Sequence, residues 1–215
     1  MRMTAILLGV ACVGVCGCQA PEQEGVENIA GLIESIEFEL PVELELTCVL
    51  PPEGTSPFVA KLIFKNAPPV RPSDPDFPSD DAPPSAVLFS TVTGEGGGTH
   101  LGRFGYSERY YGIPGFRIVA EVAFVAENGD ELYATALAQA GPTIPPPFPN
   151  ATFTGQFTFT GGTGRFDGAR GRASISAQQL GEEPLPGMPP NIPGSTAVVL
   201  CGWIDLGGDD SGRDD

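Results

Sequence analysis

Few side chains in this sequence have the chemistry that a catalytic site needs. His100 is the single histidine among 215 residues, so any triad that uses an imidazole must include it. A serine nucleophile in a hydrolase turn would show the pattern Gly-x-Ser-x-Gly, which the sequence lacks. His100 is therefore interpreted as a hydrogen-bonded structural residue, with a catalytic role as the alternative.

Glu121 is the acidic residue best placed to act inside a folded core. It alternates in the sequence with apolar residues of even number, Phe116, Ile118, Ala120, Val122 and Phe124. If these five fill an interior, Glu121 faces water, and this is the orientation we predict. The alternative is a buried carboxyl with a raised pKa, which is a frequent feature of active sites.

An aromatic-rich stretch over 104–116 lies between His100 and Glu121 in the sequence. Aromatic rings at the mouth of a fold could bind a hydrophobic or planar ligand, and the alternative is plain packing in the core and rim. The candidate ligand-binding residues are His100, Phe104, Tyr106, Tyr110, Tyr111 and Glu121.

No metal or other cofactor is predicted. The aspartates of one Pro-rich stretch, Asp74, Asp76, Asp80 and Asp81, fit no EF-hand spacing and lack its closing glutamate, so a solvated acidic loop is expected. Two thiols and His100 fall short of the four ligands of a structural zinc site.

Cys48 and Cys201 are predicted to form a disulfide. Each lies in an apolar run, and export would place the pair in an oxidising compartment. The bridge would tie the first strand to the last. By the chain-entropy model, closing so long a loop contributes about 4 to 5 kcal/mol.

The N-terminus has the layout of a secretory signal. Residues 1–17 combine Arg2 with an apolar run, and the tetrad Val15-Cys16-Gly17-Cys18 resembles a bacterial lipobox. Cys18 would then become the first mature residue and carry several acyl chains, which together give a lasting membrane anchor. An ordinary secretory signal is the alternative, and the apolar run is shorter than the roughly 20 residues of a membrane-spanning helix.

The negative net charge of the chain limits the kinds of partner that it can bind. Removing Arg2 with the leader takes the formal net charge from −16 to −17, and a field of that sign repels nucleic acids and anionic lipid headgroups. The lipid must therefore hold the protein at the membrane. Gln19, not an aspartate, follows the cysteine, and in a Gram-negative cell the resemblance to lipoproteins then implies the outer membrane. A lipid-anchored location in the bacterial cell envelope, on the periplasmic or outer face of that membrane, is therefore predicted.

Alternation of apolar and polar residues predicts an all-β domain over 35–206. It follows a flexible spacer over 18–34 and precedes a disordered acidic tail over 207–215. Pro41 marks a bend within a strand expected over 36–46. The glycine-rich run 94–98 is expected to form a turn. Pro-rich loops are expected over 66–84, 142–149 and 184–194. Further strands are expected over 58–64, 85–93, 99–106, 116–125, 131–139, 152–160, 169–177 and 196–206.

Two hairpins stand out. Asn128-Gly129 between alternating strands is the strongest short-range hairpin signal in the chain. In the second hairpin, large residues on one strand, such as Phe157 and Phe159, face small ones on the return strand, such as Ala173. That combination fills a curved sheet without overpacking it.

The turn of the second hairpin resembles a known family. Residues 157–173 read FTFTGGTGRFDGARGRA, which is similar to the signature hairpin of dirigent proteins and, more loosely, of allene oxide cyclases. The resemblance implies a single antiparallel eight-stranded calycin-like β-barrel. No catalytic residue of those families matches this chain position by position. Phe166 is expected to fold back as a plug under the sheet, and the glycines are expected to form a structural corner instead of a phosphate loop.

Three functions agree with these features. We favour a non-catalytic, lipid-anchored barrel that holds a small hydrophobic ligand or acts as an envelope scaffold. The alternative is an isomerase or cyclase that confines a reactive intermediate, as the resembled families do. A module whose Pro-rich loops bind an unknown protein partner is the third. An enzyme should show a closed apolar cavity with one or two buried ionisable residues, Glu121 or His100 first. A large, apolar interior free of charges would favour the binder, and a scaffold should be packed solid.

Overall fold

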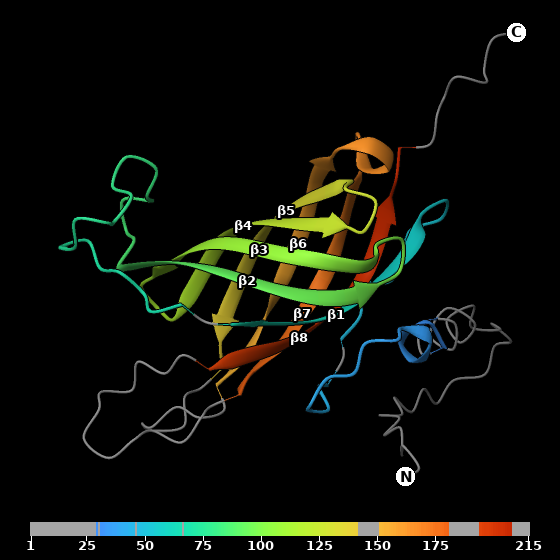
Figure 1. Ribbon diagram of the computed structural model, residues 1–215, viewed down its shortest axis with the longest axis horizontal. Coiled ribbons are helices and arrows are strands. Elements are labelled where there is room, and N and C mark those ends of the chain that lie inside the picture. Colours follow the sequence, from blue (N-terminus) through green and yellow to red (C-terminus); the bar gives the residue numbers. More distant parts are fainter. Residues whose placement is uncertain are drawn as a thin grey trace, which may run out of the picture.

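Eight antiparallel strands close into a barrel (Figure 1). The computed structural model describes residues 29, 31–45, 47–65, 67–141, 151–180 and 194–207. Each strand pairs with the next in sequence, and β8 closes the cylinder by pairing with β1. The strands are β1 (Ser56–Lys65), β2 (Leu88–Gly98), β3 (Gly102–Ile113), β4 (Arg117–Ala126), β5 (Glu131–Ala140), β6 (Thr152–Gly162), β7 (Arg170–Leu180) and β8 (Ser195–Asp205). The predicted fold class, an all-β eight-stranded antiparallel barrel, is confirmed.

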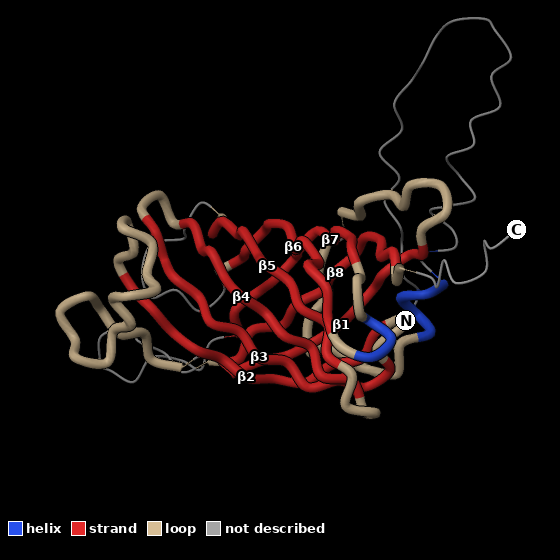
Figure 2. Tube along the Cα trace, turned by 90° about the horizontal axis from the view of Figure 1, so that it is seen from above, coloured by secondary structure: helices blue, strands red, loops and turns tan. Residues whose placement is uncertain are grey.

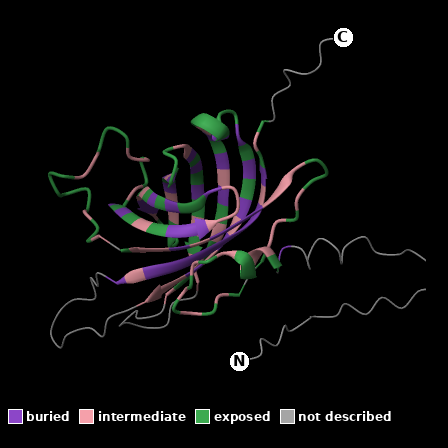
Figure 3. Ribbon diagram, turned by 45° about the vertical axis from the view of Figure 1, so that its right-hand side comes forward, coloured by how far each residue is buried: buried purple, intermediate pink, exposed green. Residues whose placement is uncertain are grey.

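The predicted alternation between interior and exterior holds along most strands, as the purple and green bands of Figure 3 show. On β4, Ala120, Val122 and Phe124 are buried, whereas Glu121 between them is exposed. Phe116 does not belong to this inward set, because it lies in the turn before β4 with a φ of 59°. Water on one face and core on the other is the arrangement that a period of two requires.

Large and small residues interlock between β6 and β7. Phe157 pairs with Ala173, and Phe159 pairs with Gly171. A Cβ on Gly171 would lie 2.8 Å from Phe159 Cδ2 and 2.3 Å from the Trp203 carbonyl oxygen. Only glycine fits there, so the small residues of this hairpin make room for the phenylalanines.

The glycine-rich run 94–98 is not a turn, contrary to the sequence prediction. It forms the last part of β2, and the chain reverses over 99–101 instead. A Cβ on Gly94 would lie 2.2 Å from the Ile63 carbonyl oxygen, and one on Gly96 would lie 2.3 Å from that of Lys61. These glycines therefore serve the close approach of β2 to β1, a use of glycine that sequence alone does not distinguish from a turn.

The strand predicted over 36–46 is also wrong. Residues 31–35 are helical, and the described residues from 36 to 50 contain no strand. The closed barrel leaves no free edge for this segment to join, so its apolar residues cover the outer wall instead. Ile29 is buried with Val59 of β1 and Cys201 of β8, with Leu32, Ile33 and Ile36 packed against them. We name residues 29–50 the strap; it begins inside the segment over 18–34 that was predicted to be a spacer.

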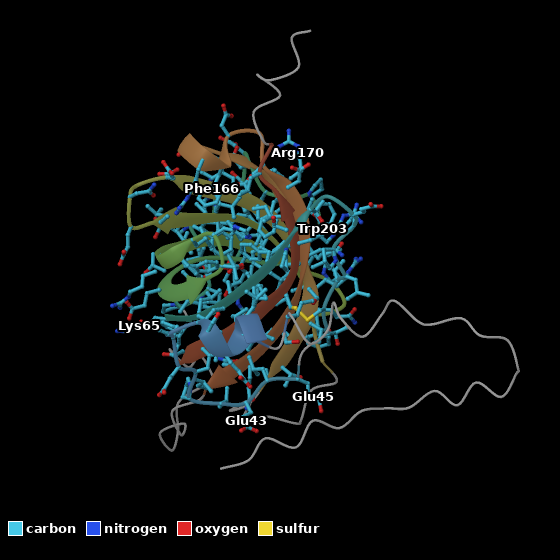
Figure 4. All side chains as sticks on the ribbon, turned by 90° about the vertical axis from the view of Figure 1, so that its right-hand side faces the viewer. Glu43, Glu45, Lys65, Phe166, Arg170 and Trp203 are labelled. Atoms are coloured by element: carbon cyan, nitrogen blue, oxygen red, sulfur yellow. A yellow bond between two sulfur atoms is a disulfide. The ribbon has the colours of Figure 1, made fainter. Side chains whose placement is uncertain are left out.

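Cys48 and Cys201 form the predicted disulfide, with 4.8 Å between their Cα atoms (Figure 4). The bridge joins the strap to β8, because Cys48 precedes the first strand of the barrel. It therefore fastens the strap to the wall where β1 and β8 meet.

The long loop between β1 and β2 is as predicted, apart from an isolated bridge between Val70 and Phe89. It extends from one end of the barrel, and the helical turn of the strap lies toward the other end (Figure 2). The leader, Cys18, the acidic tail and most of the other two Pro-rich loops lie outside the described residues. Within the described part of the chain, no helix has the length and apolar character needed to cross a membrane.

Candidate functional site

One end of the barrel interior is filled. Five residues there, Phe58, Phe159, Phe166, Leu101 and Leu132, are almost entirely inaccessible to solvent. The short 3-10 helix η1 (Gly164–Phe166) turns Phe166 inward, with an exposed fraction of 0%. We name these five residues the plug. The prediction for Phe166 is confirmed.

The other half of the interior contains a cavity of about 90 Å³. Its lining comes from strands β1 and β3–β8, and most of it is apolar. The lining residues are Phe64, Tyr106, Glu108, Tyr110, Ile118, Ala136, Ala138, Phe153, Phe157, Ile175, Ala177, Thr196 and Val198. Unlike the plug, this half has room for a guest molecule.

Glu108 places a carboxyl group in this apolar lining. It shares the inward parity of β3 with Phe104, Tyr106 and Tyr110. The Tyr106 hydroxyl donates a hydrogen bond of 2.5 Å to Glu108 Oε2. Burial raises the pKa of Glu108 from 4.5 to about 7, although the hydrogen bond from Tyr106 opposes the shift. Near neutral pH the cavity therefore holds a carboxyl that exchanges readily between its charged and neutral forms.

The described lining of the cavity provides no cation to balance Glu108. Glu108 also borders a separate hollow of about 600 Å³, whose lining includes Arg109 and Glu121, but the ion pairs of Arg109 in the described residues are with Asp81 and Glu121. Arg109, the next residue, points outward as strand alternation requires. There its Nη1 lies 3.8 Å from Glu121 Oε2, on an exposed surface. Facing Glu108 from the two neighbouring strands are Val92 and Val122, which are uncharged.

Two tyrosines and Thr196 provide the other polar side chains of the cavity lining. Burial raises the pKa of Tyr106 well above its usual value, and the nearby Glu108 charge raises it further. Burial also raises the pKa of Tyr110, against a hydrogen bond with Ser90 that lowers it. Both tyrosines therefore stay protonated and can act as hydrogen-bond donors.

A second hollow, of about 400 Å³, lies at the turn between β3 and β4. It shares Tyr110, Ile118 and Phe153 with the cavity, so these three residues stand between the two spaces. Phe116 lines its outer part and is 70% exposed. We name this hollow the mouth, because it adjoins the cavity and is open to solvent at Phe116.

The structure brings together only two of the six candidate ligand-binding residues. Tyr106 and Tyr110 line the cavity, whereas Phe104 packs in the core without lining it. Tyr111 lies on the outer wall against Phe77 and Phe89, and its buried hydroxyl has no hydrogen-bond partner among the described residues.

The two polar candidates lie apart from the cavity. His100 sits in the turn between β2 and β3, where its Nε2 is 3.1 Å from the Pro57 carbonyl oxygen. Glu121 faces water with 76% of its side chain exposed. The outward orientation of Glu121 and the structural setting of His100 agree with the sequence predictions. No group of three or more His, Cys, Asp or Glu residues in the described chain could hold a metal ion.

Sequence reasoning missed Glu108. The signal was present, because Phe104, Tyr106, Glu108 and Tyr110 share one parity of a single strand. The aromatic stretch was treated as one block, and the break in alternation at Tyr110-Tyr111 hid which residues face inward. Strict counting by two from Phe104 selects Glu108.

Comparisons with protein families, curated proteins and solved structures found no match to this chain. The dirigent and allene oxide cyclase resemblance remains a prediction. The function is therefore argued from the cavity itself.

Proposed function

We propose that this protein is an exported, lipid-anchored barrel that binds a small, largely apolar molecule in the cavity beside Glu108. The observation that carries the proposal is the contrast within the lining, where Glu108, its partner Tyr106, Tyr110 and Thr196 interrupt an otherwise apolar surface. Ligand sites of proteins combine such an apolar lining with a few convergent polar groups.

The cavity volume limits the ligand. About 90 Å³ is less than the roughly 150 Å³ of an engineered apolar cavity that admits benzene. It is also below the roughly 300 to 1,000 Å³ of pockets for drug-sized molecules. The cavity itself therefore holds a group of only a few carbon atoms, and a guest with a ring must place that ring partly in the mouth, beyond Tyr110, Ile118 and Phe153.

A packed scaffold would not need this arrangement. A buried carboxyl without a charged partner costs free energy, and an apolar residue of similar size would remove that cost. The open half keeps Glu108 beside empty space, whereas the plug shows that the same barrel can be filled. Ligand binding would account for a carboxyl that is kept beside an unfilled cavity.

Binding is tested by titrating the protein with benzyl alcohol and following chemical shifts or heat. Ala136 faces the cavity from β5, so Ala136→Leu should fill part of the space and weaken binding at least tenfold. Ala123→Leu is the matched control, because Ala123 has the outward parity of β4. Equal affinity in the wild type and Ala136→Leu, or no binding by the wild type, would overturn the proposal.

The anchor is tested separately by the intact mass of protein extracted from membranes. Cleavage before Cys18 with added acyl chains is the expected result. An unmodified N-terminus, or cleavage elsewhere, would remove the anchor from the proposal without affecting the cavity.

Glu108 also favours a second candidate, an isomerase or cyclase that confines its substrate. A carboxyl whose pKa is about 7 is suited to donate and accept a proton near neutral pH. A co-purifying molecule that gains deuterium or changes isomer in deuterated buffer would support catalysis. Retained exchange in Glu108→Gln would exclude Glu108 from that role.

A further inference from the structure

We infer that the cavity selects a small organic ammonium ion, with Glu108 as its counter-charge and aromatic rings around its cationic head. This inference rests on the proposed binding function and names the class of ligand. It follows from the carboxyl, the rings and the charge of the chain, taken in turn below.

The carboxyl lacks a basic partner in the described lining. Tyr106 gives Glu108 one hydrogen bond, which satisfies part of one oxygen and leaves the negative charge uncompensated. A ligand ammonium group would supply both the missing positive charge and further N–H donors. An ion pair that is buried and hydrogen-bonded is far more favourable than one buried charge alone.

Aromatic rings dominate the walls beside Glu108. Five line the cavity, and Phe64 and Tyr106 stack with 5.6 Å between their ring centroids. The five are Phe64, Tyr106, Tyr110, Phe153 and Phe157. Ring faces attract cations, and aromatic cages are a recurrent means of binding organic ammonium groups. An anionic ligand would meet these faces and Glu108 unfavourably.

The charge of the whole chain acts in the same direction. With a formal net charge of −16, the protein attracts cations and repels anions from solution. Carboxylate ligands such as fatty acids are therefore disfavoured at a distance as well as in the cavity.

Protons should move in a defined direction on binding. Because burial raises the pKa of Glu108 to about 7, part of the population is protonated near neutral pH, and pairing with an ammonium ion should release protons to the buffer. The other titratable groups of the cavity are Tyr106 and Tyr110, both protonated at this pH. The outward Arg109 and Glu121 are the nearest charged residues along β3 and β4. Glu108 is thus the group that accounts for the proton.

Three ligands of one size test the inference: benzylamine, benzyl alcohol and benzoate. Calorimetry in buffers of different ionisation enthalpy reports both affinity and proton exchange. We expect benzylamine to bind at least about tenfold tighter than benzyl alcohol, because only the ammonium group can pair with Glu108 and make cation–π contacts. Benzylamine should release protons, benzyl alcohol should release none, and benzoate should bind weakest.

Glu108→Gln keeps the size of the side chain and removes its charge, so it should lose the preference for benzylamine while still binding benzyl alcohol. Glu121→Gln makes the same change on the outer wall and should leave all three affinities unchanged.

The outcomes separate the two proposals. Binding of benzyl alcohol as tight as that of benzylamine, or preference for benzoate, would overturn the ammonium inference and leave the binding function standing. Failure of all three ligands to bind would count against both. Proton release by the wild type remains a test even if Glu108→Gln does not fold.

Discussion

The two halves of the barrel interior are built from the same eight strands and differ in what fills them. In the plugged half, rings pack against small residues, as Phe159 does against Gly171, and each plug residue is at most 2% exposed. In the open half, Ala136, Ala138 and Ala177 face space, and Glu108 is placed among them. The barrel thus concentrates its packing at one end and leaves the other end available for a ligand. Stability and binding should therefore respond to different substitutions.

The largest expected difference is between two phenylalanines. Phe166→Ala should cost about 3 to 5 kcal/mol of unfolding free energy, because it empties a fully buried position of the plug. Phe153→Ala should cost less than about 2 kcal/mol, because Phe153 already borders empty space. Urea denaturation of both variants measures the contrast. Equal losses would mean that the two halves are packed alike.

Glu108→Gln should stabilise the protein at alkaline pH. Burial raises the pKa of Glu108 from 4.5 to about 7, so the folded state holds an extra proton between these values and loses stability as pH rises through them. Replacing the carboxyl should add up to roughly 3 kcal/mol at pH 8 and little at pH 4. The measurement is unfolding free energy of both proteins across this range. A parallel pH dependence in the two proteins would contradict the burial of Glu108.

Two alanines of β5 compare the halves on a single strand. Ala134 and Ala136 both point inward, but only Ala136 lines the cavity. Ala134→Leu should cost about 1 to 3 kcal/mol by overpacking, whereas Ala136→Leu should leave stability within about 1 kcal/mol of the wild type. Thermal melts at one pH distinguish the two. A loss at Ala136 as large as at Ala134 would show that the cavity cannot accept added atoms.

The smallest effect is expected on the outer wall. Glu121 meets Arg109 at 3.8 Å with both side chains well exposed, and such pairs contribute at most about 1 kcal/mol. Glu121→Gln should therefore change stability by less than about 0.5 kcal/mol. Raising the salt concentration should reduce even that difference. A larger loss of stability would show that the Arg109–Glu121 pair on the outer wall stabilises the barrel.

The fold was predictable where local pattern and tertiary structure agree. Alternation along β4 and β6 reports directly which side chains face the core, and Asn128-Gly129 fixes one hairpin without reference to the rest. The disulfide followed from two cysteines in apolar runs. In these regions the sequence pattern and the barrel impose the same requirement on each residue.

Prediction failed where the same residues serve two structural uses. The glycine-rich run 94–98 is compatible with either a turn or a strand packed closely against its neighbour. Only the contacts of Gly94 with Ile63 and of Gly96 with Lys61 show that it is a strand. The alternation over 36–46 fits a strand equally well, yet the barrel has no edge to receive it. Glu108 escaped notice because acidic residues on strands usually face water, so its inward parity is visible only once the strand register is known.

The strap has a consequence for how the barrel opens. Seven of the strand pairings join sequence neighbours, but β1 and β8 meet across almost the whole domain, so this seam is costly in chain entropy to close. The strap lies over the seam through Val59 and Cys201 and is fastened there by Cys48. Reducing the disulfide should first detach the strap from β1 and β8. Hydrogen exchange would then accelerate along β1 and β8 while the central hairpins stay protected.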